Sequence, residues 1–116
     1  MFRFEELEIW KLSVDYGNEL YDISWNFPSE EKYSLGDQLR RAAVSISNNI
    51  AEGSGSTTKK NFAFFLDISV KSAFETVNIL YFAEKRNYIN PEKRKKLYDS
   101  AEVLIKRIRA FKNSLY

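Results

Sequence analysis

The sequence of 116 residues contains no cysteine and no histidine. Without cysteine the chain forms no disulfide and offers no thiolate, which fits the reducing cytoplasm where we expect this protein. Without histidine it lacks the commonest general base and the commonest metal ligand. No apolar run approaches the roughly 18 residues that span a membrane, so we expect no membrane association. We therefore predict a protein that is not an enzyme, with no catalytic residue, metal or cofactor.

The chain has few helix breakers, with only two prolines and four glycines. Apolar residues make up 44% of the chain and charged residues 29%, a balance typical of globular proteins. This length suits one core, so we predict a single domain covering residues 1–116.

The stretch Leu35–Gly53 has the clearest helical pattern in the chain. At 100° per residue its apolar side chains share one face of a helix. We predict that Gly53 ends this helix in a left-handed conformation and that Ser34 begins it as a cap, paired with Asp37. The apolar face comprises Leu35, Leu39, Ala42, Ala43, Ile46 and Ile50.

Three further helices are predicted on the same grounds. The first covers Phe4–Trp25, and Phe27-Pro28 ends it because a residue before proline avoids helical angles. The third runs from a cap at Thr57 or Thr58 to about Arg86, and the fourth begins at Asn90-Pro91. No segment has the alternation of a strand, and the connections are short. The fold class predicted is all-α, an antiparallel up-down-up-down four-helix bundle. The expected core stripes are Leu7, Trp10, Val14, Gly17, Tyr21 and Ser24, widened by Ile9 and Leu20; Phe62, Phe65, Ser69, Thr76, Leu80 and Ala83; and Leu97, Ala101, Leu104, Ile108, Phe111 and Leu115.

The third helix has a second apolar stripe, about 100° from the first. A helix that is apolar over so much of its circumference is buried on more than one side. We expect the second side to form an oligomer interface, the alternative being two neighbours within one chain. The stripe includes Ala63, and the predicted interface residues are Val70, Phe74, Val77 and Tyr81.

A polar stripe borders the apolar face of the second helix. Buried polar side chains need partners, so these residues predict a buried hydrogen-bonded network, in which Arg41 pairs with Glu52 or Glu75. A ligand pocket inside the bundle is the alternative. The predicted network comprises Gln38, Arg41, Ser45, Asn49, Glu52 and Glu75, with Ser72 beside it.

Charge is distributed unevenly, although the net charge is only +2. Residues 1–32 contain eight acids and three bases, whereas residues 91–116 contain eight bases and three acids. Oppositely charged antiparallel neighbours are one explanation, and a basic surface for nucleic acid is the other. The run Lys93–Lys96 favours the second, because a helix dipole disfavours cations in the first turn. The candidate nucleic-acid-binding residues are Arg40, Lys59, Lys60, Lys93, Arg94, Lys95, Lys96, Arg107 and Arg109.

The segments Gln38–Ile46 and Asn49–Gly53 chiefly carry a resemblance to a known family. The chain resembles the four-helix bundle proteins first found as products of intervening sequences in bacterial large-subunit ribosomal RNA genes. Asn87 departs from it, standing where glycine is usual. The resemblance implies a homo-oligomer, as a pentamer with a central channel. Through one branch it also implies an accessory role beside the reverse transcriptase of diversity-generating retroelements.

Two functions are consistent with the sequence. The first is a non-enzymatic homo-oligomeric scaffold that binds structured RNA or DNA, or serves a ribonucleoprotein, through basic surface residues. The alternative is a self-assembling protein-interaction adaptor with no nucleic-acid role, which uses the second stripe of the third helix.

Overall fold

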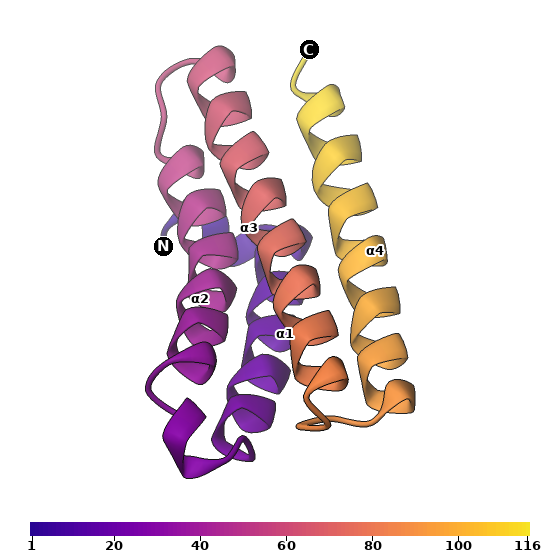
Figure 1. Cartoon of the computed structure of the whole chain (residues 1–116). Coiled ribbons are helices and arrows are strands. Elements are labelled where there is room, and N and C mark those ends of the chain that lie inside the picture. Colours follow the sequence, from indigo (N-terminus) through magenta and orange to yellow (C-terminus); the bar gives the residue numbers. More distant parts are fainter.

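The computed structural model describes all 116 residues and contains four α-helices, two short 3₁₀ turns and no strand (Figure 1). Each helix packs against two others, α1 and α3 both lying beside α2 and α4. Successive helices run in opposite directions, which confirms the predicted up-down-up-down bundle. The molecule measures 43 × 23 × 20 Å. The elements are η1 Arg3–Glu6, α1 Glu8–Trp25, η2 Ser29–Glu31, α2 Leu35–Ser54, α3 Lys59–Lys85 and α4 Pro91–Ser114.

The core lies along the predicted stripes of α2, α3 and α4. In α4 the seven-residue repeat places Leu97, Ala101, Leu104 and Ile108 in the centre of the bundle, fully enclosed by the other helices. Phe111 extends the repeat as a half-buried residue, because its ring packs against Phe62 of α3 at the end of the bundle. Periodicity alone therefore located most of the core.

The first helix differs from its predicted form in its start and in its buried face. It begins at Glu8, because Leu7 has extended angles (φ −81°, ψ 124°) that separate α1 from η1. Val14 and Tyr21, expected in the core, are exposed. The centre of the buried face is instead rotated toward Ile9 and Leu20, which the prediction placed at the edge of the stripe, and toward Tyr16 and Ile23, which it omitted.

Gly53 does not end the second helix, which continues to Ser54. No glycine has a positive φ, so the predicted left-handed cap is wrong. Gly53 is buried, and a Cβ there would lie 2.8 Å from the Cβ of Phe65 and 2.9 Å from Cδ1 of Phe62. Glycine is therefore required because α3 approaches α2 too closely for a side chain.

Two of the three predicted N-terminal caps form. Thr58 accepts a hydrogen bond from the Asn61 amide (3.1 Å), and Asn90 accepts one from the Lys93 amide (2.7 Å). Ser34 caps nothing, because its hydroxyl instead donates to Glu31 Oε1 at 2.5 Å.

A Schellman motif ends α3. Asn87 has a φ of 63°, the left-handed conformation that glycine and asparagine adopt most readily. The Tyr88 amide donates to the Ala83 carbonyl (2.8 Å), and the Asn87 amide donates to the Glu84 carbonyl (2.9 Å). The chain thereby turns sharply into α4.

Candidate functional site

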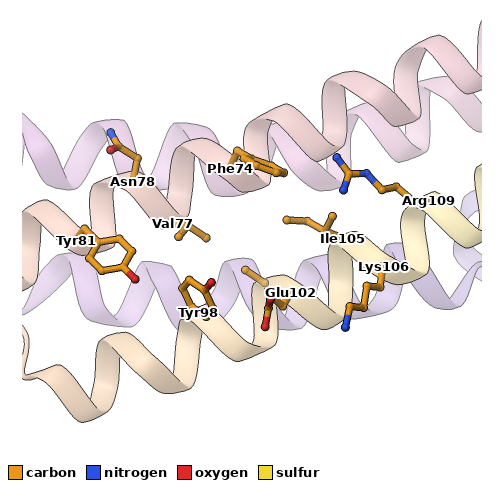
Figure 2. A pocket seen from close by; sticks show the side chains of 10 residues that line it. Phe74, Val77, Asn78, Tyr81, Tyr98, Glu102, Ile105, Lys106 and Arg109 are labelled. Atoms are coloured by element: carbon orange, nitrogen blue, oxygen red, sulfur yellow. The ribbon is translucent and has the colours of Figure 1, made fainter.

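A groove of about 410 Å³ runs along the surface between α3 and α4 (Figure 2). It exists because both helices present a second apolar row beside the one that enters the core. Figure 2 shows Phe74, Val77 and Tyr81 along α3, facing Tyr98 and Ile105 on α4. The rest of the lining is Asn78, Ala101, Glu102, Lys106 and Arg109.

The apolar part of the α3 wall consists of three of the four predicted interface residues. Phe74 is 56% exposed and Tyr81 45% exposed, while Val77 is half-buried. Val70 differs, because it lies buried in the bundle's own core and is not available to a partner. The apolar wall is therefore shorter than the sequence predicted.

Cations cover parts of the aromatic rings that line the groove. The Arg94 guanidinium lies 4.7 Å from the centre of the Tyr81 ring, and Arg109 lies 5.7 Å from that of Phe74. Arg94 also donates to Glu84 at 2.9 Å, and this hydrogen bond raises the pKa of Arg94 above its ordinary value. The Tyr81 end is thus neutralised by an ion pair, whereas Arg109 and Lys106 leave the other end positive.

Arg40 is not a surface cation, although it was predicted to bind nucleic acid. It is 7% exposed, donates to Ser24 Oγ (2.9 Å) and the Lys32 carbonyl (2.7 Å), and stacks on the Trp25 ring at 4.1 Å. These contacts join α1, α2 and the segment between them. Its role in the fold is structural.

The other candidate cations do not form one patch. Lys59 and Lys60 begin α3, and Lys93–Lys96 begin α4, so these clusters lie at opposite ends of the bundle (Figure 1). Within the second cluster, Arg94 pairs with Glu84 and Lys95 pairs with Asp99 (2.6 Å). Arg107 forms an ion pair with Glu8 of α1. The unfavourable run of cations in the first turn of α4 is therefore partly compensated within the chain.

The polar stripe of α2 forms only a small part of the predicted network. Ser45 and Ser72 lie 2.7 Å apart, and the Asn49 amide donates to the Ser45 carbonyl at 2.8 Å. Arg41 does not pair with Glu52 or Glu75, because it reaches Asp37 one turn earlier (2.8 Å). The remaining members are solvent-exposed and join no network. They are Gln38, Arg41, Glu52 and Glu75.

The comparisons with known proteins identify the family. The model of the 23S rRNA-intervening sequence protein family matches residues 5–110. The chain belongs to this family. A solved structure of a protein with unknown function from the S23 ribosomal protein family of Bacteroides thetaiotaomicron is similar, with a TM-score of 0.79 and 21% sequence identity over 89% of this chain and 96% of that chain. At this identity the likeness shows the fold alone. No curated protein matches the chain.

The α4 wall of the groove was not predicted from the sequence of this member of the 23S rRNA-intervening sequence protein family. Tyr98 and Ile105 each follow a core leucine of the α4 repeat and are themselves seven residues apart. That spacing is a second stripe, matching the one found on α3. No group of three or more acidic, histidine or cysteine side chains could hold a metal ion. No helix combines the length and apolar character needed to cross a bilayer.

Proposed function

We propose that this protein is a non-catalytic helical scaffold that assembles with further copies of itself through the α3–α4 groove. The observation that carries this proposal is the exposure of Phe74 and Tyr81 on the same wall of one groove. Contiguous apolar surface bordered by polar residues marks interaction sites. Aromatic side chains also dominate the energetics of protein interfaces, because they bury large areas with few rotatable bonds.

The energetics indicate that a partner must cover more than these two rings. Burying the exposed parts of Phe74 and Tyr81 removes roughly 200 Å² from water, worth roughly 5 kcal/mol on this side of the interface. Association itself costs roughly 4–15 kcal/mol. The groove therefore suits a partner that also covers its rims, as a second folded copy does.

Phe74→Glu tests the proposal, with Phe82→Glu as the matched control. Phe82 lies on the same helix and is 58% exposed, but it does not line the groove. We expect Phe74→Glu to lose the higher mass of the parent assembly in light scattering while its helical circular dichroism is unchanged. Phe82→Glu is expected to keep that mass. A folded Phe74→Glu protein with the parent mass would contradict the proposal, as would a parent protein that is monomeric at all concentrations.

Nucleic-acid binding is a second candidate function, favoured by cations that have no acidic partner in the chain. Lys59 and Lys60 form no ion pair at one end of the bundle, nor do Lys93 and Lys96 at the other. In a ring of copies each cluster would recur in every subunit and produce a strong local field. Contacts of this kind with phosphates are tolerant of sequence and sensitive to salt.

Fluorescence anisotropy with a structured RNA and a duplex DNA across a salt series tests this second function. Lys59→Glu with Lys60→Glu removes one cluster, and Lys93→Glu with Lys96→Glu removes the other. The cluster that contacts phosphate is the one whose loss lowers affinity and reduces the salt slope by about 0.9 per contact on duplex DNA. Absence of binding at low salt would leave self-assembly as the only proposed function.

A further inference from the structure

An aromatic ring near the start of α3 lies on the surface, although the bundle does not need it there. Phe64 is 58% exposed and does not line the α3–α4 groove. Its ring meets the half-buried ring of Phe65 edge-on, with the two ring centres 5.7 Å apart. A phenyl ring that is held by a neighbour and still exposed offers a flat apolar surface on which another planar group can stack.

Phe64 forms one side of a shallow concavity of about 610 Å³ beside the connection between α2 and α3. The Asn61 side chain is oriented there, because its amide nitrogen donates to Ser56 Oγ at 3.0 Å. The amide oxygen of Asn61 accepts no hydrogen bond within the chain, and the Thr57 hydroxyl makes none. The concavity therefore places polar groups beside the exposed ring, and no acidic residue lines it. The lining is Thr57, Thr58, Lys60, Asn61 and Phe64.

The positive charge of this segment is not compensated within the chain. Lys59 and Lys60 form no ion pair, and residues 53–66 contain neither aspartate nor glutamate. Both lysines lie in the first turn of α3, where the helix dipole is also positive. The start of α4 differs, since an acid lies in its first turn and two of its four cations are paired. The start of α3 is therefore the better anion site of the two.

Single-stranded nucleic acid matches this combination of groups. Its phosphates suit the two lysines, and an unpaired base can stack on an aromatic ring such as that of Phe64. A base inside a duplex is already paired and stacked, so it cannot cover the ring. An anion without a planar group would leave the ring in water. Charge and shape together therefore favour an unpaired strand of RNA or DNA.

We propose that the start of α3 binds single-stranded nucleic acid, with an unpaired base stacked on Phe64 and the adjoining phosphates at Lys59 and Lys60. Thr57 and Asn61 lie in the same concavity and can form hydrogen bonds with the edge of that base. This inference rests on nucleic-acid binding, the second of the proposed functions. It deepens that function, because it selects one of the two basic clusters and single strands over duplexes.

Phe64→Ala tests the inference, with Phe82→Ala as the matched control. Phe82 lies near the other end of α3 and is equally exposed, at 58%. Alanine suits an exposed helical position, so both variants should fold. Fluorescence anisotropy compares a labelled single strand of uridines with a duplex of the same length. We expect Phe64→Ala to bind the single strand about fivefold more weakly or worse, and Phe82→Ala to bind it like the parent protein.

The salt dependence separates stacking from phosphate contact. Phe64→Ala removes no charge, so we expect it to weaken binding without changing the salt slope. Lys59→Gln with Lys60→Gln is expected to reduce the slope on the single strand by about 1.4, because each lost contact contributes about 0.7.

Three results would overturn the inference while nucleic-acid binding itself stands. They are equal affinity of the parent protein for the single strand and the duplex, a Phe64→Ala protein that binds like the parent, and loss of the parent mass by Phe64→Ala in light scattering. The last result would assign the exposed ring to a contact between copies. A parent protein that binds neither nucleic acid at low salt would end both the inference and the proposed nucleic-acid function.

Discussion

The hydroxyl oxygens of Tyr16 and Thr76 lie 2.9 Å apart in the centre of the core, although 60 positions separate the two residues in sequence. The Thr76 hydroxyl donates its single proton to the Ala73 carbonyl at 2.6 Å. Tyr16 must therefore donate to Thr76. Because ionised tyrosine has no proton to donate, the hydrogen bond in this direction requires a neutral Tyr16.

The stability of the bundle should fall at high pH because of Tyr16. Burial raises the pKa of Tyr16 to about 12, against 10.0 for an ordinary tyrosine. A folded pKa above the unfolded one means that the contribution of Tyr16 is complete below pH 10 and is lost as pH rises toward 12. The loss amounts to roughly 2–3 kcal/mol over that window. Urea unfolding at pH 8, 10 and 11.5 measures this loss. We expect Tyr16→Phe to be about 1 kcal/mol less stable than the parent protein at pH 8, and its stability to fall less as the pH rises. If the free energy of unfolding fell equally with pH in the parent protein and in Tyr16→Phe, this account would be contradicted.

Arg40→Ala should destabilise the fold strongly, unlike the adjacent Arg41→Ala. Removal of Arg40 leaves its acceptors Ser24 and Lys32 without a donor and uncovers Trp25, so we expect a loss of about 3 kcal/mol. Arg41 forms an exposed ion pair with Asp37, and its loss should have little effect on stability because water screens the pair. Arg40→Lys should also be destabilising, because lysine cannot reproduce the planar fork. Chemical unfolding measures the loss of stability in all three variants. Similar losses for Arg40→Ala and Arg41→Ala would contradict a structural role for Arg40.

The periodic part of the sequence predicted the fold well, because helices with clear apolar stripes and short connections have few ways to pack. The stripe of α4 and that of α2 both enter the core as expected. The stripe of α1 misled for a physical reason. It includes Val14 and Tyr21, which are exposed, because the bundle buries the neighbouring face of α1 that contains Tyr16 and Ile23.

The candidate site was less predictable, because its properties depend on distances between helices. A basic residue in the sequence gives no sign of whether its charge is free, and only the structure pairs Arg94 with Glu84 and buries Arg40. The separation of Lys59 and Lys93, by contrast, follows from the predicted helix starts, because successive helices of an up-down bundle begin at opposite ends. The spacing of apolar residues on α3 predicted that wall of the groove. The α4 wall was not predicted, because its residues adjoin the more regular seven-residue repeat that enters the core.

Gly53→Ala should destabilise the contact between α2 and α3, whereas Gly55→Ala should not. A Cβ at Gly53 would overlap with Phe65 and Phe62, and overpacking of this kind costs about 1–3 kcal/mol. At Gly55 the nearest atom to an added Cβ is the Glu52 carbonyl oxygen at 3.5 Å, an ordinary contact, and the φ of −85° suits alanine. We expect Gly55→Ala to be neutral or stabilising by up to about 1 kcal/mol. Thermal unfolding of the two variants distinguishes close packing from a general need for glycine in this segment.

Asn87 should tolerate glycine and reject alanine, because its backbone is left-handed. The φ of 63° costs most L-residues roughly 1–2 kcal/mol, whereas glycine adopts it freely and asparagine at a reduced cost. We expect Asn87→Ala to lower the free energy of unfolding by about 1 kcal/mol, and Asn87→Gly to leave it equal or slightly raised. Asn113→Ala, at an exposed position near the end of α4, controls for loss of the amide side chain. If glycine and alanine at position 87 were equally destabilising, the side chain of Asn87 rather than its backbone conformation would determine the turn.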